Sequence, residues 1–447
     1  MTASEFPGQW LSEQIAISRL FFCRRKPRGM AMSASDKAVT ARTFQASFDR
    51  NNSISAFLMG ALPAVGGTVI SVMLYTFFVW AVMSLALKRY EFQMSRSDRE
   101  LAWTFTAFAA LIVLTALIGP NRPEIPHSIV WLLAFLSPWT VIPRLRASRG
   151  IDLLQPYVVG AAIGAVGAAL QGSIQAVFFG VQAEGGAGNA AVFSIMSLCL
   201  MGIGGLNIAS RSRTRQLLAI SAVVGGIVAL AMSLIRGVGL AMFPILALLV
   251  IFAPARWRSA VWRPASLLVL AAAATALYSV QRLLDGRWNQ TVRELHRILM
   301  GEQTTKSIGE RLRLWRAGWD AFLDSPIWGH GIQNRMASLV PELSSDGLPV
   351  RNFTHAHNGF LSIAIDGGIL TLTALLAVLC VPVFIAWRAP RDPNYRIRLF
   401  VALIVSTAYA ASGVTQIMFK HDIMDAFFVF AAIVIAASIP DPSWHAA

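Results

Sequence analysis

The character of this sequence changes most sharply at residues 354–387, THAHNGFLSIAIDGGILTLTALLAVLCVPVFIAW, where a long polar segment ends and an apolar run begins. The run at 359–387 exceeds the roughly 20 apolar residues that a helix needs to cross the hydrocarbon core of a bilayer. The polar segment before it covers residues 281–355 and itself follows another apolar run. The pattern therefore places a long polar segment between two membrane-spanning helices.

The composition is that of an integral membrane protein. Of 447 residues, 55% are hydrophobic and 14% are charged, and the mean hydropathy is +0.58. Soluble domains contain about 25% charged residues. The net charge of +15 could indicate a nucleic-acid partner, but the basic residues lie mainly in short loops between apolar runs, where they set membrane orientation. We therefore expect no nucleic-acid binding.

Ten apolar segments have about the length of a membrane helix. They lie near residues 101–119, 128–142, 154–181, 190–209, 216–235, 237–254, 264–280, 359–387, 399–418 and 423–439. The run at 54–87 is too long for one crossing, and Pro63, Gly66 and Gly67 predict two short helices joined by a tight turn. The predicted fold class is an all-α integral membrane protein with about twelve transmembrane helices.

Alternate loops differ in charge, and this difference predicts the orientation. The basic loops carry Lys88, Arg89, Arg96 and Arg99; Arg144, Arg146 and Arg149; Arg211, Arg213 and Arg215; Arg256, Arg258 and Arg263; and Arg388, Arg391, Arg396 and Arg398. Such loops stay in the cytoplasm, so the polar segment lies outside. The predicted organisation is a disordered basic cytoplasmic tail at 1–53, nine helices at 54–280, the external segment at 281–355, three helices at 356–440 and a cytoplasmic tail at 441–447.

The external segment is expected to contain two short amphipathic helices. Thr291 and Glu294 have capping-box spacing at the start of the first, which ends at Gly301. The second begins at Ser307 and ends at Ser325-Pro326. Its apolar face holds Leu312, Trp315, Trp319 and Phe322, and its other face holds Arg313, Arg316 and Asp320. This helix either lies in the membrane interface or packs its aromatic residues on the outer surface of the protein.

Two residues outside the basic loops could carry chemistry. Arg236 interrupts the apolar stretch at 216–254, and its charge requires a place at an external helix end or in a polar cavity. It could also mark only a tight turn. His357 begins the helix after the external segment, where a neutral imidazole can take a proton from a hydroxyl. It could also merely cap that helix.

The external location limits the chemistry, because neither ATP nor sugar nucleotides are supplied outside the cytoplasm. A metal at His355 and His357 is disfavoured, since no carboxylate or cysteine stands beside them at ligand spacing. Glycosyl transfer from a lipid diphosphate fits the available residues. Fixed guanidiniums would stabilise the leaving diphosphate, and a base would deprotonate the acceptor hydroxyl.

Several motifs in order resemble those of the O-antigen ligase and polysaccharide polymerase family. They are Arg311-Leu312 with Trp315; Pro326-Ile327-Trp328-Gly329-His330-Gly331; His355-Ala356-His357-Asn358-Gly359-Phe360-Leu361; and Asp366-Gly367-Gly368-Ile369-Leu370. A weaker match is Ser233-x-x-Arg236. Family members carry Gly-x-x-Gly after the histidine-asparagine pair, whereas here Thr371 follows Gly368, which puts close helix packing at that point in doubt.

The resemblance implies a metal-independent, inverting transfer from undecaprenyl diphosphate, without a cofactor, at the periplasmic face of a bacterial inner membrane. By motif, His357 would be the base or would orient the acceptor, while Arg236 and Arg311 would hold the diphosphate. Asn358, Arg313 and His355 would contact substrate. The acceptor would be lipid A core in a ligase or a growing glycan in a polymerase.

A secondary transporter with a similar number of helices is the alternative from another class. Such a protein would be expected to carry ionisable residues at the membrane midplane. The candidate carboxylates Asp152, Asp366, Asp422 and Asp425 lie near predicted helix ends instead.

Overall fold

The computed structural model describes residues 34–118, 132–148, 151–255, 307–345 and 355–440, together with isolated positions within 257–300 and residue 353. Its contacts divide the chain into Met1–Phe48 and Asp49–Ala447. Only the first turns of one helix are described in the first unit. Throughout the described residues the regular structure is helical and no strand occurs, as the predicted fold class requires.

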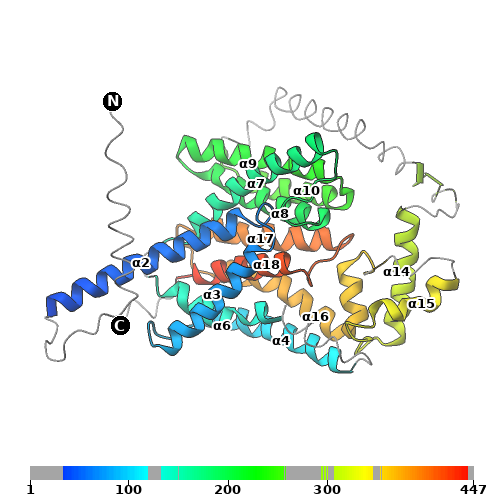
Figure 1. Cartoon of the computed structure of the whole chain (residues 1–447), viewed down its shortest axis with the longest axis horizontal. Helices are drawn as coiled ribbons and strands as arrows, with labels where there is room; N and C mark the ends of the chain where they lie inside the picture. Colours follow the sequence, from blue (N-terminus) through cyan, green and yellow to red (C-terminus); the bar gives the residue numbers. More distant parts are fainter. Residues whose placement is uncertain are drawn as a thin grey trace. The chain divides into compact units, whose positions relative to one another are not determined.

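The described helices follow the predicted apolar segments closely (Figure 1). They are α2 (Ala34–Ala61), α3 (Val69–Ala86), α4 (Arg96–Ile118), α6 (Pro138–Arg146), α7 (Leu154–Phe178), α8 (Ala190–Gly205), η2 (Leu206–Ala209), α9 (Arg213–Ser233), α10 (Arg236–Phe252), α14 (Ser307–Asp324), α15 (Arg335–Ser345), α16 (Gly359–Arg388), α17 (Tyr395–Gly413) and α18 (Asp422–Ala437). The predicted crossing at 264–280 and part of that at 128–142 lie outside the described residues.

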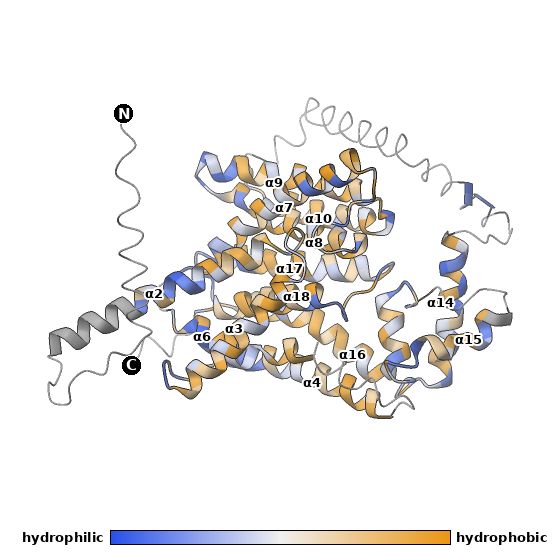
Figure 2. Cartoon of the chain, viewed as in Figure 1, coloured by the Kyte–Doolittle hydropathy of each residue, from blue (hydrophilic) through white to orange (hydrophobic). Residues whose placement is uncertain are grey.

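Seven of the described helices are long and apolar enough to cross a membrane. They are α3, α4, α7, α8 with η2, α9, α16 and α17, and α10 is a shorter apolar helix. Apolar residues dominate these helices in Figure 2, and hydrophilic residues gather at their ends. The protein is therefore a multi-pass membrane protein, and the count of twelve crossings stays a prediction.

The run at 54–87 forms two helices, as predicted. α2 ends at Ala61, a turn follows, and α3 begins at Val69. Gly67 has a φ of +59°, which glycine adopts without the strain that a side chain would cause. α2 begins at Ala34, within the tail expected at 1–53. The buried Asn52 donates a hydrogen bond to the Ser148 hydroxyl at 2.6 Å, which fixes this part of the chain.

Small residues allow the second half of α2 to pack closely on α7. A Cβ atom on Gly160 would collide with the carbonyl oxygen of Phe57, and one on Gly164 would collide with that of Ala61. Glycines four residues apart form one face of a helix and let two backbones touch. The contact explains why the end of α2 belongs to the membrane bundle.

The centre of the bundle is formed by α8 and α18. Every residue of α8 except Ala191 and nearly every residue of α18 is buried. A helix that is apolar on all sides is stable only when other helices surround it. α18 contacts α3, α4, α6, α8, α16 and α17. Its phenylalanines meet rings from other helices; Phe428, for example, lies 4.9 Å from Tyr409 between ring centroids.

α14 and α15 lie beside the first turns of α16 (Figure 1). The second predicted amphipathic helix is confirmed as α14, Ser307–Asp324. Trp315 of the predicted aromatic face packs against the core that α14 shares with α15 and α16. Leu314, Ala317, Gly318 and Ala321 are buried, and the small size of the last three lets α14 approach α16 closely. Trp319 is 54% exposed, so the predicted aromatic face is only partly buried.

Candidate functional site

The start of α14 positions Arg311. Glu294 accepts hydrogen bonds from the backbone N–H groups of Ile308 and Gly309 at 2.8 and 3.2 Å, which caps the helix. The spacing of Glu294 from Thr291 suggested a capping box, but Thr291 lies outside the described residues. Burial lowers the pKa of Arg311, and the carboxylates of Glu294 and Glu310 act against this shift. Arg311 is thus a partly buried cation near the beginning of a capped helix.

The start of α16 positions the two histidines. Asn358 is the N-cap, and its side-chain oxygen accepts a hydrogen bond from the Leu361 N–H at 3.0 Å. Ala356 is buried in the small core between α14, α15 and α16. His357 has a φ of +49°, a left-handed conformation that is uncommon for a residue with a side chain. Such strain often occurs at functional sites, where surrounding packing enforces it.

The imidazole rings of His355 and His357 lie together, with 4.3 Å between ring centroids. The ring of Phe353 meets His357 edge-on at 6.2 Å. Burial lowers the pKa of His357, and the positive charge of Arg311 lowers it further. Burial, followed by the charges of His357, Arg335 and Arg311, lowers the pKa of His355 to about 3. Both imidazoles are therefore neutral at pH 7.

The Nδ1 atom of His357 is buried and has no hydrogen-bond partner among the residues that the structure describes. A buried ring nitrogen without a partner loses the free energy of a hydrogen bond, so such atoms are rare unless they have a function. A neutral imidazole with an unpaired nitrogen can accept a proton from a substrate hydroxyl. The predicted role of His357 as a base is chemically compatible with this environment.

Sequence reasoning missed a buried ion pair behind the histidines. The Arg335 guanidinium donates from Nε to Asp366 Oδ1 at 2.8 Å and from a terminal nitrogen to Oδ2. Both residues are buried. The pair fixes α15 against α16, and Arg335 also acts on the pKa of His355. The sequence signal was present, because Asp366 belongs to a family-like motif, but its partner lies 31 residues away.

Two glycine motifs join at a kink in α16. Gly367 and Gly368 have non-helical backbone angles, and Gly368 has a φ of +66°. The N–H of Gly331 donates to the Asp366 carbonyl at 2.9 Å, and the N–H of Ile369 donates to the Pro326 carbonyl at 2.8 Å. The segment 326–331 thus satisfies backbone groups that the kink releases from the helix. We call this arrangement the kink clamp.

Thr371 occupies the position where the family pattern has a second glycine. Its hydroxyl donates to the carbonyl of Ile363 at 3.0 Å and also lies 3.2 Å from that of Gly368. Thr371 is fully buried, and α16 still packs against α4. The hydroxyl thus pairs with a carbonyl that the kink frees, and α16 contacts α4 without a second glycine at this position.

Arg236 lies at a helix boundary, as its charge required. α9 ends at Ser233, Leu234 has a φ of +56°, and Arg236 is the first residue of α10. A Cβ atom on the adjacent Gly237 would collide with the side chain of Thr415. The turn between α9 and α10 therefore touches the loop that follows α17.

The same loop contacts the start of α16. A Cβ atom on Gly359 would lie 3.1 Å from the carbonyl oxygen of Gln416 and 3.0 Å from Met418. Because Gly237 contacts Thr415, the residue after Arg236 and the second residue after His357 both adjoin the loop 414–418. The fold brings Arg236 to the same end of the bundle as the histidines.

Two further predicted site residues are Arg313 and Asn358. Arg313 is half-buried on α14, but the charge that shifts the pKa of His357 comes from Arg311. The side-chain oxygen of Asn358 is used to cap α16. The structure thus brings Arg311, His355 and His357 together. Asn358 caps α16, the helix that follows the two histidines.

An apolar pocket opens beside this group of residues. It has a volume of about 360 Å³ and lies between α14 and α16. Its lining consists of Trp315, Trp319, Phe322, Asn358, Phe360, Leu361, Ala364 and Leu372. Asn358 is the polar member of this lining and the residue after His357, so an apolar group in the pocket would lie next to the histidine.

The chain also matches a known protein family. Residues 220–376 match the family model described as O-antigen ligase, whereas a search of curated proteins gives no match. The match extends from within α9 to within α16. It includes the predicted site residues Arg236, Arg311, Arg313, His355, His357 and Asn358. Residues 220–376 of this membrane protein therefore contain the O-antigen ligase domain that the motifs resemble.

Proposed function

We propose that this protein is a glycosyltransferase of the bacterial inner membrane that moves a glycan from undecaprenyl diphosphate to a sugar hydroxyl. The family match supports a glycosyl-transferring membrane enzyme with a polyprenyl-linked donor and a glycan acceptor. The observation that carries the proposal is the grouping of His357, His355 and Arg311 at the start of α16, next to an apolar pocket.

His357 is proposed as the general base. Its lowered pKa keeps the ring neutral, and a ring nitrogen accepts the proton of the acceptor hydroxyl. The hydroxyl oxygen then forms a bond to the anomeric carbon while the bond from that carbon to the diphosphate oxygen breaks. Attack opposite to the leaving group inverts the configuration at the anomeric carbon. No metal is needed to balance this step, because the proton ends on the imidazole.

Arg311 and Arg236 are proposed to bind the diphosphate. The leaving group gathers negative charge as the glycosidic bond breaks, and guanidiniums bind phosphate oxygens with two parallel hydrogen bonds. Arg311 lies close enough to His357 to lower its pKa. Arg236 reaches the same end of the bundle through the contact of Gly237 with Thr415. Arg313 and His355 would contact the sugars nearby.

The apolar pocket is proposed to receive the first isoprene units of the donor. Its lining has almost no polar surface apart from Asn358. Burial of apolar surface stabilises a bound chain by roughly 25 cal/mol per Å². Trp319 on the rim is more than half exposed, which suits a helix that touches lipid at the membrane interface. The donor diphosphate would then lie between the pocket and the arginines.

The site is proposed to face the periplasm, because the segment that carries Arg311 is the long polar one and the basic loops lie on the other side. The donor would arrive in the outer leaflet of that membrane. This location accounts for a mechanism that uses a lipid-linked sugar instead of a sugar nucleotide.

The acceptor decides between two enzymes with the same chemistry. We propose a ligase that transfers a preassembled glycan to lipid A core, and the alternative is a polymerase that joins repeat units. Deletion of the gene, followed by analysis of the lipopolysaccharide, tests this. Loss of a ligase leaves long glycan unattached to core, whereas loss of a polymerase leaves single units. Ion-driven uptake by reconstituted vesicles, without glycan transfer, would instead establish a transporter.

A further inference from the structure

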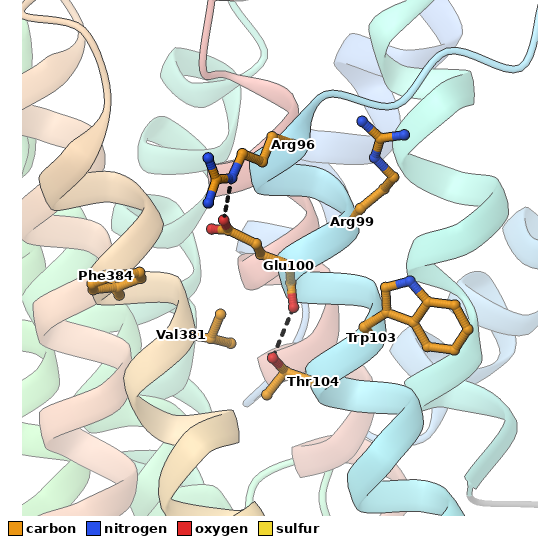
Figure 3. A pocket seen from close by; sticks show the side chains of 7 residues that line it. All are labelled: Arg96, Arg99, Glu100, Trp103, Thr104, Val381 and Phe384. Carbon is orange, nitrogen blue, oxygen red and sulfur yellow. Dashed lines mark hydrogen bonds and ion pairs between the residues drawn. The ribbon is translucent and has the colours of Figure 1, made fainter.

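A second cavity lies where α4 begins and α16 ends, about 25 residues along α16 from the proposed active site (Figure 3). Its volume is about 590 Å³. It is lined by Arg96, Arg99, Glu100, Trp103, Thr104, Val381 and Phe384. α4 and α16 pack against each other, and both are candidate membrane spans. The cavity therefore lies where two membrane helices leave the hydrocarbon core.

The polar end of this cavity has an excess of positive charge. Arg96 donates from Nε to Glu100 at 2.9 Å, and Arg388 lies 3.8 Å from the same carboxylate. The Arg388 guanidinium also stacks on Phe384, 4.9 Å from its ring centroid. Arg99 is exposed, and its guanidinium has no ion-pair partner among the described residues. Arg96 and Arg388 thus share one carboxylate, and with Arg99 the three guanidiniums leave two positive charges in excess.

Asp98, which also lies in the first turn of α4, does not neutralise this excess. Asp98 is fully buried and binds Arg146 at 2.5 Å on the inner side of α4. The first turn of α4 adds the positive end of a helix dipole, which makes arginines at positions 96 and 99 unfavourable for helix stability. An anion bound by both arginines would offset this cost.

The other end of the cavity is apolar and accessible. Trp103 is 62% exposed and Phe384 is 45% exposed. Trp103 is held by an edge-on contact with Trp139, at 4.9 Å between ring centroids. The rings of Trp103 and Phe384 lie further into the candidate spans than the arginines. Figure 3 shows this for Trp103, which lies below Arg99 on α4. Arginines above tryptophan and phenylalanine match the boundary between lipid headgroups and acyl chains.

We propose that this cavity binds an anionic phospholipid, with its phosphate at Arg96 and Arg99 and an acyl chain along Trp103 and Phe384. Guanidiniums bind phosphate oxygens in pairs, and the apolar wall gives a binding surface that inorganic phosphate cannot use. The lipid would fill the groove between α4 and α16. This site is separate from the proposed glycosyl transfer and does not depend on it.

The test uses the full-length protein purified in detergent and titrated with phosphatidylglycerol, with lipid binding followed by native mass spectrometry. Each arginine near a membrane surface changes binding about fivefold, so Arg96→Gln with Arg99→Gln should weaken binding about thirtyfold. Arg211→Gln with Arg213→Gln is the matched control, because these arginines are exposed at the start of α9. The control pair should bind phosphatidylglycerol as tightly as the wild-type protein does. Binding of phosphatidylcholine should not differ between the wild-type protein and Arg96→Gln with Arg99→Gln.

A second measurement does not depend on the folding of the arginine variants. Phosphatidylglycerol with brominated acyl chains should quench the fluorescence of the wild-type protein more than that of Trp103→Phe. The difference reports a chain beside Trp103, although the protein has 13 tryptophans. Equal quenching of both proteins, or an equal loss in the control arginine pair, would overturn the site. Displacement of the lipid by millimolar inorganic phosphate would show that only an anion binds there.

Discussion

His357 has the properties of a base at the level of the single residue: a lowered pKa, a buried nitrogen without a partner in the described structure, and a left-handed backbone. We predict that His357→Ala lowers the rate of glycan transfer by about 10²- to 10⁴-fold, because general base catalysis is lost. His357→Asn keeps a residue that tolerates this backbone and should be equally inactive. A reconstituted transfer assay measures both.

The control for His357 is His296→Ala, which changes an exposed histidine of the same polar segment. It should transfer glycan at the wild-type rate. All three variants should insert into the membrane normally. Wild-type transfer by His357→Asn would remove this histidine from the mechanism.

Arg311 and Arg236 should depend on geometry as well as charge. We predict that Arg311→Ala and Arg236→Ala each lower transfer by about 10²- to 10³-fold, as loss of transition-state hydrogen bonds does in other enzymes. Lysine at either position should recover part of the rate, since it keeps the charge but not the two-pronged donor. Arg316→Ala, an exposed arginine on α14, serves as the control. Equal losses for alanine and lysine at both sites would indicate a purely structural role.

The pH dependence of transfer follows from the lowered pKa of His357. Because burial and Arg311 hold this pKa below 6.5, the base stays neutral at pH 6.5, and the rate should fall only at lower pH. Arg311→Gln removes a positive charge, so the pKa of His357 should rise and the acid limb should move to higher pH. Arg311→Lys should leave the limb in place. Measurement of kcat/KM between about pH 5 and 8 checks this.

The kink clamp controls α16 at the level of the helix. Gly368 has a φ of +66°, and a Cβ atom there would collide with the carbonyl oxygen of Ile327. We predict that Gly368→Ala destabilises the protein by about 1–3 kcal/mol. Gly239→Ala in α10 is the control, because nothing lies within 4 Å of its added Cβ. Thermal unfolding in detergent should show a lower Tm for Gly368→Ala alone.

Prediction of single helices from the sequence succeeded where the signal is local. The bounds of α14 follow from Ser307 at its start and the proline after Ser325. The face that α14 buries could not be predicted in the same way. Aromatic residues gave the stronger hydrophobic signal, but close contact with α16 selected Ala317, Gly318 and Ala321. The close approach of α16 decided which face of α14 is buried. The periodicity of the sequence carries no information about that approach.

The topology of the whole molecule can be tested with cysteine labelling. In a chain whose cysteines are replaced, we predict that His357→Cys reacts with a membrane-impermeant maleimide added to intact spheroplasts. Arg391→Cys, in a basic loop on the other side, should react only after the membrane is opened. Labelling of position 357 from the cytoplasmic side alone would contradict a periplasmic site.

The sequence by itself determined the membrane class, the turn at Gly67, the helix boundary at Arg236 and the residue types of the candidate site. Hydropathy and helix signals arise from neighbours along the chain, so these features need no knowledge of packing. Only the tertiary structure decided that α18 lies at the centre, that Arg335 pairs with Asp366 and that Arg311 approaches His357. Those contacts join segments far apart in the sequence, and they form because helices must bury complementary faces against one another.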